Sequence, residues 1–295
     1  MDHKAFIRNL DREHLAALME KNDRIGVLHL FGHIAVIAIG GIWVMQGWLL
    51  WPAVMVLLGI AISFLFTLEH EATHQTPFKS RWINEMAGWV SGLLILQPFY
   101  WFRYFHLAHH RYTNIPGKDP ELMSGYKPEE RQAFFWYLTG IPYWMGMARQ
   151  IWRNAKGQRF HSYIPERVQK RVTIEARMML GFYALACLSL IVSPVLFWVW
   201  ALPMVLGMPF LRLYLLAEHG RCAFVANMFE NTRTTYTTRI VRFIAWNMPY
   251  HVEHHSIPAV PFHKLPELHE SIKGHHVVTS QGYSGFAAEY LRETR

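Results

Sequence analysis

The sequence is poor in the residues that build zinc, iron–sulfur and disulfide-linked domains. Its 295 residues include only 2 cysteines, Cys187 and Cys222, and no CxxC pair. A cysteine-rich metal site is therefore excluded, and no disulfide framework is expected. The chain also lacks a GxGxxG motif and a His-Pro-Gly-Gly motif. We expect neither a bound dinucleotide nor a fused haem domain.

Charged side chains are the second shortage. They make up 17% of the chain, against about 25% in soluble domains, while 52% of the residues are hydrophobic. The formal net charge is +8, and the Lys and Arg fall mainly outside the apolar stretches. Loops beside anionic lipid explain this basic balance better than nucleic acid does. We therefore predict an integral membrane protein without a nucleic-acid partner.

Long apolar runs predict four transmembrane helices. About 20 apolar residues, rising 1.5 Å each, cross the hydrocarbon core of ~30 Å. The runs are residues 25–45, 49–68, 178–193 and 195–217. Short turns at 46–48 and 193–194 predict two hairpins, with both termini on one side of the membrane. Residues 82–102 are apolar but interrupted by polar and helix-breaking residues, so we expect a re-entrant or interfacial helix there.

The remaining segments are polar or amphipathic. Residues 1–24 predict an amphipathic surface helix rather than a secretory signal, which leaves targeting to the first membrane helix. The aromatic stretch 134–147 is too short to span and predicts an interfacial helix, with Arg149 and Arg153 at headgroup level. The predicted parts of the single domain are 1–24, the first hairpin 25–68, a cytoplasmic and interfacial segment 69–177, the second hairpin 178–217, and a cytoplasmic segment 218–295.

Three histidine clusters follow the apolar stretches. One has the spacing HxxxH and two have the spacing HxxHH. Offsets of three and four residues share one helical face, and neutral imidazole is the commonest nitrogen ligand for transition metals. The eight candidate metal ligands are His70, His74, His106, His109, His110, His251, His254 and His255. Eight imidazoles exceed what one reactive metal can use, so two metals are expected. Nitrogen ligation argues against Mg²⁺ and Ca²⁺, and iron, copper and zinc stay open.

Further residues beside these clusters are candidates for a role at the metals. His219, at the end of the fourth apolar run, is a candidate ninth ligand. Asn247, one helical turn before His251, could hold a metal-bound water or orient a ligand. Glu218 and Glu253, like Glu69 and Glu71, adjoin ligand histidines and could accept their outer N–H groups.

The other histidines and acids receive simpler interpretations. We expect His29 and His33, near the start of the first span, to satisfy backbone or headgroup partners. Asp119 and Glu121 are interpreted as exposed loop charges. The histidines outside the paired clusters are interpreted as solvated or structural: His161, His263, His269, His275 and His276.

The three clusters resemble the histidine boxes of membrane fatty acid desaturases and related hydroxylases. The resemblance runs from about residue 30 to about residue 270 and includes Pro258, Pro261 and Phe262 after the third cluster. It implies a di-iron centre held by the eight box histidines, with His219 at the position of an extra histidine. It also implies O₂-dependent desaturation of a fatty acyl chain, with electrons from a separate ferredoxin, rubredoxin or b-type cytochrome.

The full expectation is an all-α integral membrane protein with four transmembrane helices in two hairpins, interfacial helices and a cytoplasmic histidine-rich cap for two metals. A bacterial inner membrane is the expected location. Two other classes stay open. A hydroxylase or ketolase of a lipid, carotenoid or alkane would use the same metals. A membrane metal carrier is disfavoured, because transporters place their ligands near the membrane midplane.

Overall fold

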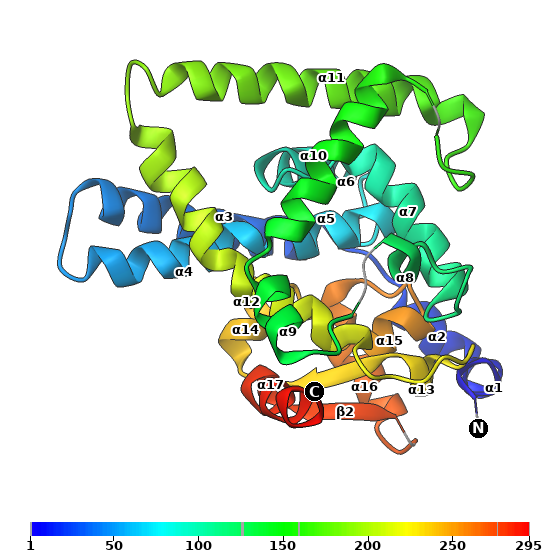
Figure 1. Ribbon diagram of the computed structural model, residues 1–295. Helices are drawn as coiled ribbons and strands as arrows, with labels where there is room; N and C mark the ends of the chain where they lie inside the picture. The colour runs from blue at the N-terminus through cyan, green and yellow to red at the C-terminus, as the bar shows by residue number, and fades with distance from the viewer. Residues whose placement is uncertain (1, 125–126, 159, 276, 295) are drawn as a thin grey trace.

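The computed structural model describes residues 2–124, 127–158, 160–275 and 277–294 (Figure 1). The chain is mostly helical. In chain order the elements are α1 (His3–Asn9), α2 (Arg12–Leu18), α3 (Asp23–Met45), α4 (Trp51–Ser63), α5 (Leu65–His74), α6 (Arg81–Leu94), α7 (Phe99–Tyr112), α8 (Pro120–Ser124), α9 (Arg131–Leu138), α10 (Ile141–Lys156), α11 (Glu166–Ser189), η1 (Phe197–Ala201), α12 (Leu202–His219), α13 (Met228–Asn231), β1 (Arg233–Tyr236), α14 (Arg239–Ile244), α15 (His251–Ser256), η2 (Phe262–Lys264), α16 (Leu265–Ile272), β2 (Val278–Gln281) and α17 (Gly282–Glu293).

Four helical stretches of the described chain are long and apolar enough to cross a membrane. They are Arg12–Met45, Trp51–His74, Glu166–Ser189 and Phe197–His219. Each covers all or most of one of the four apolar runs that predict a span. The segment 82–102 is not among them. It forms two helices, α6 and α7, because residues 95–98 break the path with a left-handed Leu96 and a proline at position 98.

The helices of the first predicted hairpin, α3 and α4, pack against each other and project together from the rest of the molecule (Figure 1). The helices of the second predicted hairpin separate after their connection. There α11 packs along α10, whereas α12 packs along α4. Helix α11 also begins at Glu166, twelve residues before the apolar run at 178, because the polar residues that precede the run continue the same helix. Hydropathy marks the apolar part of a helix rather than its first residue.

Close contact between α4 and α12 depends on two glycines. A Cβ at Gly207 would lie 2.1 Å from the carbonyl carbon of Gly59, and a Cβ at Gly59 would lie 1.9 Å from the carbonyl oxygen of Pro203. Neither position has room for a side chain. Small residues let helix backbones approach in this way in membrane proteins. The contact fixes α12, and hence His219 at its end, relative to the second span.

The polar segments pack around the histidine-bearing helices. The predicted amphipathic segment forms two short helices, α1 and α2, whose Phe6 and Leu18 are buried. The predicted interfacial helix 134–147 is divided into α9 and α10 at Gly140, whose φ of 71° ends the first helix. The all-α expectation needs one correction. Strands β1 and β2 pair in parallel, with Arg233 opposite Val278, in stretches of β-branched residues.

The α4–α12 contact makes a testable prediction. Replacing Gly207 by Leu must push the two helices apart, which we expect to cost about 1–3 kcal/mol of stability. Thermal unfolding of the detergent-purified variant measures the effect, with the loss of the monodisperse peak as the readout. Gly181→Leu on α11 is the matched control, because nothing lies within 4 Å of a Cβ there. Equal unfolding midpoints for the two variants would show that the contact is not tight.

Candidate metal centre

Four helices deliver the nine candidate histidines to one place. Helix α5 carries the first cluster in its last two turns, α7 carries the second near its end, and α15 carries the third. His219 is the last residue of α12. The first two clusters and His219 therefore lie at or near the C-terminal ends of their helices, and the third cluster occupies the short helix α15. Seven of the nine rings are buried, and His74 and His110 are half-buried.

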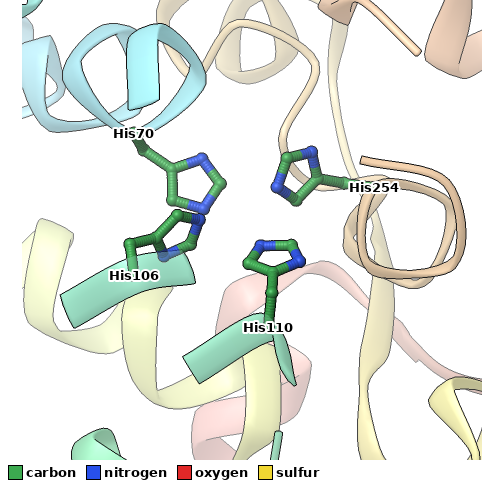
Figure 2. Close-up of side chains that lie close together, drawn as sticks. All are labelled: His70, His106, His110 and His254. Atoms are coloured by element: carbon green, nitrogen blue, oxygen red, sulfur yellow. The ribbon is translucent and has the colours of Figure 1, made fainter. Parts of the chain in front are cut away.

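The first imidazole group consists of His70, His106, His110 and His254. One ring nitrogen of each lies within 4.8 Å of those of the others. Figure 2 shows the four rings directed at a common point from α5, α7 and α15. His74 extends the group, because its Nε2 lies 2.9 Å from Nε2 of His106.

The second imidazole group consists of His109, His219 and His255, again with ring nitrogens within 4.8 Å of one another. His251 belongs beside it. The Nε2 atoms of His109 and His251 each lie 3.2 Å from Nε2 of His219. The two groups adjoin, because the rings of His110 and His255 stack with centroids 3.9 Å apart.

Helical spacing explains how each HxxHH cluster serves both groups. All three positions lie on one broad face, but the fourth residue along lies about 40° to one side of the first histidine and the third residue lies about 60° to its other side. In α7, His106 and His110 join the first group and His109 joins the second. In α15 the assignment reverses, since His254 joins the first group and His255 the second. Each cluster therefore bridges two centres, which a simple HxxxH pair does not do.

The donor set fits transition-metal ions. Both nitrogens of His110, Nε2 of His254, Nε2 of His255 and Nδ1 of His70 are buried and have no hydrogen-bond partner in the described chain. A buried nitrogen without a partner is costly. Some rings can share a proton with a neighbour, because three pairs of Nε2 atoms lie about 3 Å apart. The other buried nitrogens have no such partner among the described residues. Metal ions at the two centres would satisfy the orphaned nitrogens together.

Outer partners aim several rings inward. The carbonyl of Asn231 lies 3.1 Å from Nδ1 of His219 and can only accept, so that ring holds its proton outside and turns Nε2 to the centre. Nδ1 of His255 lies 3.1 Å from Oγ1 of Thr113. This arrangement fixes the tautomer in the way that metal sites require.

The interpretation of Asp119 as an exposed loop charge is wrong. Its side chain is buried, and its carboxylate oxygens lie 3.0 and 3.1 Å from Nδ1 of His109. Backbone N–H groups of Asn114 and Glu121 also donate to it. A turn after α7 brings the acid back to the histidine. The signal in the sequence is an acid shortly after a turn that ends a ligand-bearing helix. Glu121 lies near too, with Oε2 3.5 Å from His109 Nε2.

The proposed carboxylate partners divide into two kinds. Oε1 of Glu218 lies 3.3 Å from Nδ1 of His251, and Oε1 of Glu71 lies 3.3 Å from Nδ1 of His254. These glutamates stand where an outer N–H would be held. Glu253 instead contacts Nδ1 of His269 at 2.5 Å and accepts from Thr234. It ties α15 to α16 and β1.

Asn247 and the remaining histidines have other partners. The side-chain amide of Asn247 donates to the carbonyl of Phe262 at 3.1 Å, and the residue has a left-handed φ of 55°. His29 and His33 contact the carbonyls of Phe243 and Ala61, both at 2.8 Å, as their structural interpretation expects. His276 lies outside the described residues.

Burial keeps most of the rings neutral, as metal ligands must be. It lowers the pKa of His254 to about 3. It also lowers the pKa of His106, His110, His251 and His255 well below the ordinary value. His109 differs, because the carboxylates of Glu121 and Asp119 outweigh burial and raise its pKa.

Comparison with known proteins identifies the class. A family model described as fatty acid desaturase matches residues 46–280. The chain belongs to this family and is an oxidoreductase. The match includes all nine histidines and begins before the second span.

Individual relatives are distant. An sn-1 oleoyl-lipid 12-desaturase of Anabaena variabilis is 22% identical, over 81% of this chain and 74% of its own length. A fatty acid conjugase of Calendula officinalis is 22% identical, over 77% of this chain and 68% of its own. A dihydrorhizobitoxine desaturase of Bradyrhizobium elkanii is 28% identical, over 75% of this chain and 68% of its own.

The Asp119 contact predicts a loss of metal affinity. Replacing Asp119 by Asn removes a carboxylate acceptor from His109, and outer partners of this kind are worth about 10–100-fold in affinity. Competition for Fe²⁺ against a coloured chelator measures the change. Glu129→Gln is the control. Glu129 is exposed, and its substitution removes the same charge from the following loop. Unchanged iron affinity in Asp119→Asn would contradict the assigned role.

The lowered pKa values predict acid sensitivity of the metal-free fold. Below the ordinary histidine pKa of about 6.5, the unfolded chain takes up protons that the buried rings refuse. Stability present above about pH 6.5 is then lost as the pH falls toward about 3, the pKa of His254. Thermal unfolding of chelator-treated protein across this range measures the loss. His254→Asn should show a shallower slope than the parent, and a flat profile in the parent would contradict the prediction.

Proposed function

We propose that this desaturase-family enzyme holds two iron ions and uses O₂ to oxidise an unactivated C–H bond of a lipid, most simply to form a C=C bond in a fatty acyl chain. The main support is the pair of adjoining imidazole groups, in which several buried ring nitrogens have no hydrogen-bond partner among the described residues. The ligands proposed are the nine histidines. The first group with His74 would hold one iron, and the second group with His251 would hold the other. Glu218 is proposed to orient His251.

Asn247 and Glu253 have weaker support for a place beside the metals. The amide nitrogen of Asn247 is engaged by Phe262, which leaves its oxygen as the group that could meet a metal-bound water. The Glu253 carboxylate is engaged by His269 and Thr234. We propose that Glu253 stabilises α15 as a unit rather than touching a box histidine.

Bound iron would supply the one-electron chemistry with O₂ that an unactivated C–H bond requires. The chain's residues hold the rings, set their tautomers and exclude water. Burial of His70, His106 and His254 removes water from the centre of the first group. His74 and His110, the half-buried pair, border the side from which a substrate methylene would approach.

We propose that the histidine-bearing side faces the cytoplasm of a bacterium, with the apolar helices in its inner membrane. Four apolar helices and the family match support the membrane location. The basic balance of the segments between the spans supports the orientation. The reaction needs two electrons from outside the chain, and a ferredoxin, rubredoxin or b-type cytochrome with its reductase is the proposed donor.

Two alternatives would use the same geometry. A hydroxylase or ketolase of a lipid, carotenoid or alkane needs the same two metals and differs in the product. One relative is named as a dihydrorhizobitoxine desaturase, so the substrate of this chain need not be a fatty acyl chain. A metal carrier has less support, since the imidazole groups lie at helix ends and are closed by buried carboxylates.

Metal analysis is the first test. Elemental analysis and Mössbauer spectroscopy of protein made with iron-57 should give about two coupled irons per chain, the number that the two imidazole groups suggest. Gas chromatography with mass spectrometry of the host lipids then separates the products. A new C=C bond supports desaturation, and C–OH or C=O supports the alternatives. A single zinc ion would overturn the oxidative scheme.

Removing single ligands should abolish turnover without unfolding the membrane part. His109→Ala takes one ring from the second group, and His254→Ala takes one from the first. We expect each variant to insert in the membrane, to lose iron and to give no product. His161→Ala, outside both groups, should keep activity. Full activity in either ligand variant would refute the assignment.

A further inference from the structure

An open groove lies between α6 and α11, away from the imidazole groups. Its volume is about 1320 Å³, larger than the ~300–1,000 Å³ of typical small-molecule pockets. Residues of α6 and α11 line it, with Tyr100 from the start of α7, and no histidine contributes to the lining. The groove is therefore a second feature of the molecule, independent of the metal chemistry.

The lining changes from basic to apolar in the same direction along both helices. On α11, Arg167, Lys170 and Arg171 come first, followed one and two turns later by Ile174 and Met178. Offsets of three and four residues place them on one helical face.

Helix α6 repeats this order. Arg81 stands at its first position, and Trp82, Met86 and Trp89 follow along the groove. The two helices together give the groove one cationic end and one apolar end.

Among the contacts of the described residues, one of the four cations that line the groove has a partner. Arg171 lies over the ring of Tyr100 at 3.8 Å and bonds Glu85 at 3.2 Å. Arg81, Arg167 and Lys170 are exposed, and their side chains have no ion pair or hydrogen bond to any described residue. The carboxylates that line the groove, Glu85 and Glu175, are both engaged. The three exposed cations of this end thus have no ion-pair partner among the described residues.

Helix α11 sets this end at the membrane surface. It is one of the four helices apolar enough to span. Its charged residues extend from Glu166 to Arg177, and its apolar run begins at Met178, at the far end of the groove. Basic side chains at the start of a span lie at headgroup level, and the following apolar turns lie among acyl chains. The basic end of the groove would therefore lie at headgroup level, before the apolar run of α11 begins.

We propose that this groove binds one anionic membrane phospholipid. Its phosphate would contact Arg167, Lys170 and Arg81, and an acyl chain would lie along Trp82, Met86 and Ile174. A free phosphate would use only the basic end. A lipid without phosphate would leave the three cations without a partner, and the quaternary ammonium of phosphatidylcholine would add a further positive charge beside them. The polarity gradient fits a molecule that carries both an anion and a long apolar chain.

The groove also adjoins the anchor of the second histidine cluster. Glu175, in its lining, accepts the backbone N–H of Tyr100 at 2.9 Å, in the first turn of α7. A lipid bound there would cover this junction between α11 and α7. Occupation should therefore raise the thermal stability of the protein.

Native mass spectrometry of the full chain, released from nanodiscs, tests the proposal. The nanodiscs contain phosphatidylcholine and phosphatidylglycerol with equal acyl chains. We expect one phosphatidylglycerol to be retained in preference. Arg167→Ala with Lys170→Ala should weaken retention about tenfold or more, and Arg167→Lys with Lys170→Arg should restore it. Arg149→Ala with Arg239→Ala, exposed and outside the groove, should leave it unchanged.

The apolar half has its own test. Ile174→Ser with Met178→Ser should weaken retention, while Leu185→Ser, exposed on α11 beyond the groove, should not. Equal retention of phosphatidylcholine, or displacement of the lipid by glycerophosphoglycerol as effectively as by whole phosphatidylglycerol, would overturn the proposal. Iron content and unfolding midpoints of the variants in detergent check their folding. These outcomes do not depend on turnover, so failure here and failure of the proposed function are distinguishable.

Discussion

The structure depends on holding nine imidazoles in one small buried region. Neutral rings at this density leave buried nitrogens without a hydrogen-bond partner among the described residues, as at His110 and His254. Such an arrangement is costly unless something else accepts those lone pairs. Metal ions at the proposed sites would do so, and ion binding would then contribute directly to the folding of this region. The metal-free protein should therefore have its weakest region where its chemistry lies.

Carboxylates lie on the outer side of several rings. Asp119, Glu218 and Glu71 each lie close to the Nδ1 atom of a different histidine. Because these acids come from three separate segments, the site cannot form from one box alone. The same is true of the ligands, since α7 and α15 each contribute to both groups. Bringing these rings and acids together requires all of these segments to be folded.

The sequence predicted the four apolar helices and the nine histidines, because hydropathy and spacing are local properties. It did not predict Asp119, which reaches His109 only after a turn reverses the chain. It also did not predict the separation of α11 from α12. That arrangement depends on Gly59 and Gly207, whose close contact joins helices far apart in sequence. Packing between distant segments leaves no periodic signal in a single sequence.

The histidines at the ends of α5 and α12 link the membrane region to the site. His70 lies one turn before the end of the second apolar stretch, and His219 is the last residue of the fourth, and the two enter different imidazole groups. The spacing of the two centres is therefore set partly by how α4 packs on α12, at the level of Gly59 and Gly207. Any change in helix packing within the membrane would move one group against the other. A bilayer that holds these helices firmly is thus part of what keeps the two centres in register.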